Sequence, residues 1–169
     1  MSNLSEIVST VISGGIIIIP TEFAYCYAVD PLNKSAVKKL IELNKFQDIK
    51  QEINILVGDL NDVPNLLESI EPSEEQNAIK TWPSEKAILF SHPSKWLSKD
   101  LYYQEKNLAL RLPTEPFVLE ILHAIGQPLA TIAIYDKNNL VRNSLSLKNS
   151  EYPYLKVQQS LSGVLPEVI

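Results

Sequence analysis

Hydroxyl, carboxylate and phenol side chains follow directly after four isoleucines in GGIIIIPTEFAYCYAVDP, residues 14–31. Ligands of α/β proteins bind beyond the carboxyl ends of strands, so Thr21, Glu22 and Tyr25 are candidates for holding a polar ligand. A structural role explains the same residues, since Thr21 can form a turn or cap a helix and Tyr25 and Tyr27 can fill a core. Without further context, these residues favour the structural role.

Arginine and lysine side chains occur where an anion can be bound. Arg111 lies inside the apolar strand candidate LALRL, residues 108–112, and a buried arginine needs a partner such as a carboxylate or a phosphate. An edge strand with Arg111 facing water explains the pattern equally well. Lys45 and Lys50 lie in a polar connection and can meet phosphates, although a pair of loop lysines is more often only solvated.

The sequence predicts no catalytic nucleophile and no metal site. Cys26 has no recognisable base nearby, so the role of a small buried hydrophobic residue is favoured. His92 and His123 are far apart in the sequence and lack the spacing of metal ligands. The sequence contains no Walker loop, no GxGxxG and no GxSxG, so the enzyme classes that carry these motifs lose support.

Composition indicates one globular domain without disulfides. The chain has 169 residues, of which 45% are hydrophobic, and a net charge of -5. This charge argues against a uniformly basic nucleic-acid binder but leaves a local basic face open. The single cysteine excludes a disulfide framework and a cysteine-based zinc cluster. Without a signal peptide or a long apolar segment, we expect a soluble cytoplasmic protein that does not bind membranes.

Hydrophobic periodicity predicts helices that alternate imperfectly with short strands. We expect helices at residues 4–12, from 33, at 62–70, 73–80 and 114–125, and strands at 16–19, 53–57, 87–90, 108–112 and 129–135. Residues 136–139, DKNN, predict a turn, and the segment from about 150 stays unassigned. This pattern is typical of an α/β domain with a mixed sheet.

Capping residues predict where two of the helices begin and end. Ser73 and Gln76 have capping-box spacing for the helix at 73–80. Thr114 can cap the helix that follows it, in which Pro116 is tolerated in the first turn. Gly126 closes the same helix.

The order of these segments resembles the YrdC-like family, the threonylcarbamoyl-AMP synthases. Residues 14–45 are similar to the family's strand, its P-T-(D/E)-x-x-(Y/F)-G motif, its Asp-Pro turn and its helix ending in K-x-R. The likeness continues in Trp82-Pro83 and in LALRLPTEPFVLEILHAIGQPLA, residues 108–130. It spans roughly residues 4–140 as a coarse match.

The resemblance implies a fold and a reaction for the chain, taken as a single domain over residues 1–169. The fold is an open, twisted mixed sheet with flanking helices around a concave, positively charged cavity. Family members are nucleotidyltransferases that combine L-threonine, bicarbonate and ATP with magnesium into threonylcarbamoyl-adenylate and pyrophosphate. A partner enzyme then passes the threonylcarbamoyl group to an adenosine of tRNA. The implied substrates bind transiently, so no permanent cofactor is expected.

The resemblance also implies which residues bind substrates, while no catalytic residue or metal ligand is assigned. Threonine and the carbamate would meet Thr21, Tyr25, Arg111 and Thr131. ATP phosphates would meet Lys45 and Lys50.

Several family motifs are altered in this sequence. The glycine after the aromatic residue is Cys26, K-x-R reads NKF at 44–46, P-G-P-x-T reads PSEKA at 83–87, and S-x-N reads AIY at 133–135. These changes remove phosphate ligands and keep part of the threonine side. Each lost charge-assisted hydrogen bond costs about 1.5–3 kcal/mol, so we predict that synthase activity is weakened or lost.

Two alternatives to a weakened synthase stay open. One is a non-catalytic protein that binds double-stranded RNA or tRNA through a local basic patch formed by Lys34, Lys38, Lys39, Lys45 and Lys50. The other is a pseudoenzyme that binds threonine or a protein partner through the part of the pocket that is kept.

Overall fold

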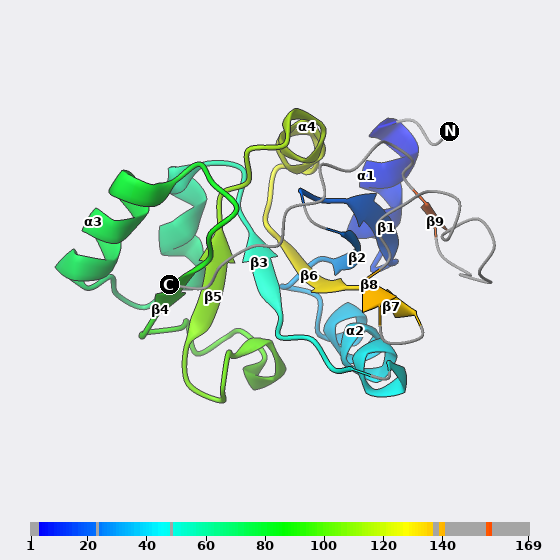
Figure 1. Ribbon diagram of the computed structural model, residues 1–169, viewed down its shortest axis with the longest axis horizontal. Helices are drawn as coiled ribbons and strands as arrows, with labels where there is room; N and C mark the ends of the chain where they lie inside the picture. Colours follow the sequence, from blue (N-terminus) through cyan, green and yellow to red (C-terminus); the bar gives the residue numbers. More distant parts are fainter. Residues whose placement is uncertain (1–3, 23, 48, 137–138, 141–154, 157–169) are drawn as a thin grey trace.

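A seven-stranded mixed sheet forms the centre of the protein (Figure 1). The computed structural model describes residues 4–22, 24–47, 49–136, 139–140 and 155–156. The strand order is β4-β5-β3-β6-β2-β1-β9. Its strands are β1 (Ile17–Pro20), β2 (Tyr25–Val29), β3 (Asn54–Leu56), β4 (Ile88–Phe90), β5 (Leu108–Arg111), β6 (Leu129–Ala133) and β9 (Leu155–Lys156). The predicted α/β class with a mixed sheet is therefore confirmed.

Strand directions in the sheet are mixed. β1 pairs in parallel with β9, and β3 pairs in parallel with β5, whereas the other neighbours are antiparallel. A separate antiparallel pair, β7 (Tyr135–Asp136) and β8 (Asn139–Leu140), brackets the predicted turn at 136–139.

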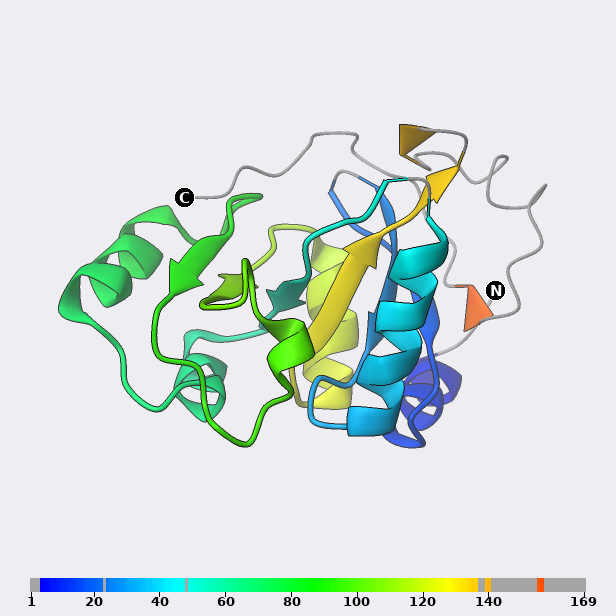
Figure 2. The same ribbon diagram turned by 90° about the horizontal axis from the view of Figure 1, so that it is seen from below.

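Helices cover both faces of the sheet because its central strands are apolar on both sides. The helices are α1 (Leu4–Ile12), α2 (Lys34–Phe46), α3 (Pro72–Thr81) and α4 (Pro116–Ile125), with the 3-10 helices η1 (Leu60–Leu66) and η2 (Lys99–Leu101). Side chains of β1, β2 and β6 alternate between a core with α2 and a core with α1 and α4. Figure 2 shows α2 and α4 on opposite sides of β6. None of the described helices is long and apolar enough to cross a membrane.

Helix α2 confirms the predicted start at residue 33. Asn33 is the N-cap, and its side-chain oxygen accepts a hydrogen bond of 3.0 Å from the backbone N–H of Ala36. Ala36, Val37 and Leu40 are buried. The apolar stripe therefore packs against the sheet and leaves the lysines of α2 exposed.

Three details of the predicted elements are wrong. Residues 62–70 do not form an α-helix, because Pro64 lies inside the segment and the structure has the short η1 instead. Helix α3 begins one residue earlier than predicted, with Pro72 in the first turn and a capping box of Glu71 and Glu74. Thr114 does not cap α4, since Glu115 occupies the N-cap. Gly126 ends α4 as predicted, in the left-handed conformation with φ of 77°.

Candidate functional site

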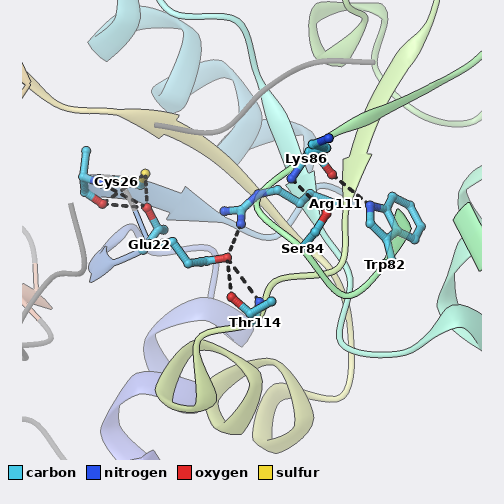
Figure 3. A network of polar contacts seen from close by, with 9 residues as sticks. Glu22, Cys26, Trp82, Ser84, Lys86, Arg111 and Thr114 are labelled. Atoms are coloured by element: carbon cyan, nitrogen blue, oxygen red, sulfur yellow. Dashed lines mark hydrogen bonds and ion pairs between the residues drawn. The ribbon is translucent and has the colours of Figure 1, made fainter. Parts of the chain in front are cut away.

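A buried ion pair lies at the centre of the candidate site (Figure 3). Nη1 of Arg111 donates a hydrogen bond of 2.5 Å to Oε2 of Glu22, and both side chains are almost completely buried. The same carboxylate oxygen accepts a bond of 3.2 Å from the backbone N–H of Thr114. The pair therefore joins the β1–β2 connection to the end of β5 and the start of α4.

Arg111 is buried in an interior strand. β5 lies between β4 and β3, and Arg111 is 1% exposed. The sequence was equally compatible with an edge strand on which Arg111 faces water. The position of β5 inside the sheet excludes that alternative. Because the guanidinium donates to a carboxylate of the chain itself, its charge is at least partly balanced before any substrate arrives.

Thr21 uses its hydroxyl within the β1–β2 connection. The hydroxyl donates to the backbone oxygen of Ala24 at 2.7 Å and lies 3.6 Å from Sγ of Cys26. The backbone N–H of Thr21 donates to the same oxygen at 3.0 Å. This bonding pattern is that of a turn former, the structural role that the sequence favoured.

Cys26 is fully enclosed beside Thr21. Burial raises the pKa of its thiol from 9.0 to about 12, and the hydrogen bond with Thr21 opposes this rise only in part. The thiol is therefore protonated at neutral pH, which agrees with the interpretation of Cys26 as a buried hydrophobic residue rather than a nucleophile.

Tyr25 and Thr131 do not lie on the same face of the sheet. Tyr25 is 0% exposed and packs in the core with α2, whereas Ala133, which alternates in phase with Thr131 along β6, belongs to the core with α1 and α4. The hydroxyl of Thr131 donates to the backbone oxygen of Asn54 on the neighbouring strand at 2.8 Å. The hydroxyl of Thr131 is thus engaged inside the sheet.

Side-chain hydrogen bonds link the last turn of α2 to the segment that follows it. Nδ2 of Asn44 donates to the backbone oxygen of Gln51 at 2.7 Å, and Oδ1 of Asn44 accepts from the backbone N–H of Gln51 at 2.9 Å. Nε2 of Gln47 donates to the same Oδ1 at 3.2 Å, while Oε1 of Gln47 accepts from the backbone N–H of Tyr135 at 2.7 Å. Asn44 and Gln47 therefore join α2, the segment after it and the start of β7.

The cationic side chains near this end of α2 point into solvent. Lys45 and Lys50 are exposed, and neither side chain makes a hydrogen bond or ion pair with another described residue. Phe46, at the last position of the altered K-x-R motif, is 88% exposed. The structure thus does not bring the two predicted nucleotide-binding lysines into contact with Arg111.

Residues 83–87, which replace the P-G-P-x-T motif, form a turn next to β5 that is held by hydrogen bonds within the turn and with Trp82. Nε1 of Trp82 donates to the backbone oxygen of Lys86 at 2.9 Å. The backbone N–H of Lys86 donates to Oγ of Ser84 at 3.1 Å, and the backbone N–H of Ser84 donates to Leu112 at 3.0 Å. Figure 3 shows this turn beside Arg111.

The arrangement supplies a buried cation that is already paired, Arg111, while the altered motifs carry the exposed Lys45 and the half-buried Glu85 and Lys86. No three His, Cys, Asp or Glu side chains come together as metal ligands in the part of the chain that the structure describes. Local sequence patterns do not indicate the roles of Thr114 and Gln47, and they mark Glu22 as a polar candidate without showing Arg111 as its partner.

Comparisons with known proteins agree with this fold. A Sua5/YciO/YrdC family model, described as telomere recombination, matches residues 9–152. Threonylcarbamoyl-AMP synthase of Marinobacter nauticus is 25% identical over 122 residues, which are 72% of this chain and 64% of that protein. The chain therefore spans slightly less than two thirds of this relative's length.

Solved structures resemble the chain along almost its whole length. P. abyssi Sua5 complexed with L-threonine has a TM-score of 0.76 at 15% identity, over 99% of this chain and 47% of that one. E. coli YciO has a TM-score of 0.74 at 16% identity, over 98% of this chain and 81% of that one. These likenesses concern the fold, and they confirm the predicted YrdC-like architecture.

Proposed function

This chain belongs to the Sua5/YciO/YrdC family as a YrdC-like domain related to threonylcarbamoyl-AMP synthase, and from that premise we propose that its ATP-dependent activity is weakened or lost. The family reaction brings a carbamate against the α-phosphate of ATP. Two anions must approach each other, so cationic and hydrogen-bonding groups carry most of the rate enhancement. The proposal depends on whether this chain offers such groups.

The observation that carries the proposal is the hydrogen bond from Tyr135 to Gln47. It joins the segment at 44–47 to the segment at 133–135, the two places where the resemblance expects phosphate ligands. Asn44 is engaged with Gln51 and Gln47, so its amide also serves the fold. A phosphate at these positions would have to displace hydrogen bonds that stabilise the protein. Because positions 44 and 46 carry no cation, no charge-assisted hydrogen bond from them would offset the free energy lost.

Binding at the amino-acid side is expected to survive better than ATP binding. Thr21, Tyr25 and Arg111 are retained as residue types, and although Tyr25 is buried and the hydroxyl of Thr21 bonds Ala24, the Arg111–Glu22 pair holds the β1–β2 connection in place. L-Threonine that binds the folded state would raise its melting temperature. We therefore expect a thermal shift with L-threonine that ATP with magnesium neither produces nor enlarges.

Pyrophosphate release tests the proposal directly. The purified chain, at high concentration, is incubated with L-threonine, bicarbonate, ATP and magnesium, with the Marinobacter nauticus synthase as positive control. We expect release at least about a thousandfold slower than in the control, which corresponds to the loss of two or three charge-assisted hydrogen bonds. Threonine-dependent release within about tenfold of the control would show that the site works with other residues.

RNA binding is a second candidate, favoured by the lysines of α2. Lys34, Lys38 and Lys45 are exposed and recur at spacings that put them on one face of the helix. Phosphate contacts release counterions, so genuine binding of tRNA would weaken steeply as salt concentration rises. An affinity for tRNA that does not change with salt concentration would exclude RNA binding as a function. So would an affinity that is unchanged when the three lysines are replaced by glutamine.

A further inference from the structure

Carboxylates and lysines are strongly segregated along the chain. Residues 51–79 contain seven carboxylates and no lysine, arginine or histidine, whereas residues 34–50 contain five lysines. The acidic segment includes η1 and all of α3 except its last two residues, Lys80 and Thr81, and α3 packs against the edge strand β4. In Figures 1 and 2, α3 lies at the end of the molecule remote from α1. A positively charged partner would be attracted to this end.

One hollow on this surface is an apolar groove of about 220 Å³ between η1 and α3. Its lining includes Leu60, Val63, Ile70, Glu75, Ile79 and Phe90. Leu60 is 44% exposed and Ile79 is 63% exposed, so aliphatic side chains border the groove at the surface. A groove of this kind accepts an aliphatic side chain from a partner.

The second hollow is a cleft of about 410 Å³ beside Trp96. Its lining includes Leu32, Asp62, Asn65, Trp96 and Gln127, and η1 contributes residues to both hollows. Trp96 is 55% exposed. An indole face next to a carboxylate suits a guanidinium, which stacks on the ring and is balanced by the negative charge.

Each hollow also contains a carboxylate that the described part of the chain leaves without a partner. Glu68, Glu71 and Glu74 are engaged with Lys95, His92 and backbone N–H groups. By contrast, no described residue makes a side-chain hydrogen bond or ion pair to Asp62 or Glu75. These two carboxylates are therefore available to an incoming cation, one in the cleft and one in the groove.

We propose that the η1–α3 face, defined as η1, α3 and Trp96, binds a basic amphipathic segment of a partner protein. An aliphatic residue of that segment occupies the groove beside Ile79, and an arginine lies against Trp96 and Asp62. The occupant is basic because the carboxylates in both hollows are unpaired, and it is amphipathic because both hollows also expose apolar surface. This surface does not involve Arg111 or Glu22, so the inference stands independently of the proposed function.

The test uses a fluorescein-labelled amphipathic peptide of about four helical turns, built from leucine, alanine and arginine. A second peptide carries glutamate in place of every arginine. Anisotropy reports binding, and a blue shift of tryptophan emission reports burial of Trp96, since Trp82 is already buried. We expect saturable binding of the arginine peptide only, weakening as salt concentration rises.

Variants place the binding on this face. Glu75→Lys and Asp62→Lys are each expected to weaken the arginine peptide about tenfold, and Ile79→Ser by a comparable factor. Glu120→Lys is the matched control, because Glu120 is exposed on α4 and the change in net charge is identical. The control is expected to change affinity by less than about twofold.

Three results would overturn the proposal. Equal weakening by Glu75→Lys and Glu120→Lys would mean that the peptide is attracted only by net charge. Absence of saturable binding, or equal binding of the glutamate peptide, would mean that the hollows do not select a basic segment. Self-association of the chain that Glu75→Lys abolishes, measured by sedimentation, would identify a second copy as the occupant.

Discussion

Glu22 and Arg111 are 89 residues apart in the sequence and form a buried ion pair of 2.5 Å. Two charges removed from water are tolerated only when each is held by well-placed partners, and Thr114 supplies a further hydrogen bond to the carboxylate. The pair fixes the β1–β2 connection, in which Thr21 is already turned inward. The Arg111 side chain, which the resemblance assigns to substrate binding, is therefore already bound to a carboxylate of the protein itself, that of Glu22.

Removing one member of this pair should destabilise the protein strongly. Glu22→Gln leaves the Arg111 charge buried without its carboxylate, so we expect the free energy of unfolding to fall by about 3–5 kcal/mol. Urea unfolding measures the change. The double variant Glu22→Gln/Arg111→Met should recover part of the loss, because no charge is then buried. Equal stability of Glu22→Gln and the exposed control Glu120→Gln would contradict a structural role for the pair.

Cys26 should make the protein less stable at alkaline pH. Burial raises the pKa of its thiol from 9.0 to about 12 in the folded state. Between these values the folded state holds a proton that the unfolded state has released, so the free energy of unfolding falls by about 1.4 kcal/mol per pH unit. The contribution is fully present below pH 9 and is lost as pH rises towards 12.

Comparison with Cys26→Ala isolates this effect, since other alkaline titrations are shared by both proteins. Thermal or urea unfolding from pH 8 to 10.5 should show the wild type losing about 2 kcal/mol more than the variant over this range. Parallel pH profiles would mean that the thiol is not buried. In the folded wild type at pH 8, iodoacetamide should label Cys26 only at the rate of unfolding.

Asn44 should stabilise the segment after α2. Asn44→Ala removes its three side-chain hydrogen bonds with Gln47 and Gln51, so we expect a loss of about 1–3 kcal/mol. Asn77→Ala is the control, because Asn77 is exposed on α3. Urea unfolding measures the free energy of unfolding of both variants. An Asn44→Ala protein as stable as the wild type would show that these hydrogen bonds do not stabilise the segment after α2.

Gln47 should protect the backbone N–H of Tyr135 from exchange with solvent. Gln47→Ala removes the acceptor at 2.7 Å, so exchange at Tyr135 should become faster. Gln47→Glu keeps an acceptor oxygen at nearly the same place and should preserve protection. Amide hydrogen exchange compares the three proteins. Identical exchange at Tyr135 in all of them would show that the end of α2 and the start of β7 are not joined in solution.

Most of the fold could be predicted from local patterns. Ile16 to Ile19 predicted a strand buried on both faces, and β1 occupies Ile17–Pro20. The apolar stripe predicted a helix from residue 33, and α2 occupies Lys34–Phe46 with Asn33 as its N-cap. Strand β2 was missed, because YCYAV mixes hydroxyls and a thiol with apolar groups, and TEFA gives no glycine or asparagine turn signal before it.

The contacts of the candidate site could not be predicted in the same way. The burial of Arg111 implied a partner, but local patterns cannot choose between Glu22 and a bound anion. Thr114 has the residue type of a helix cap, and only the folded chain shows its N–H and hydroxyl turned to Glu22. Gln47 and Tyr135 are 88 residues apart, so their hydrogen bond depends on the packing of α2 beside β6.

Calorimetric titration of the folded chain with ATP and magnesium, with and without L-threonine and bicarbonate, tests the central claim most directly. The claim is that the segments at 44–47 and 133–135 serve the fold instead of holding phosphates. We predict no saturable heat from ATP, and a threonine heat that ATP does not alter. Saturable ATP binding that tightens when threonine and bicarbonate are present would contradict the account, because it would require a working phosphate site.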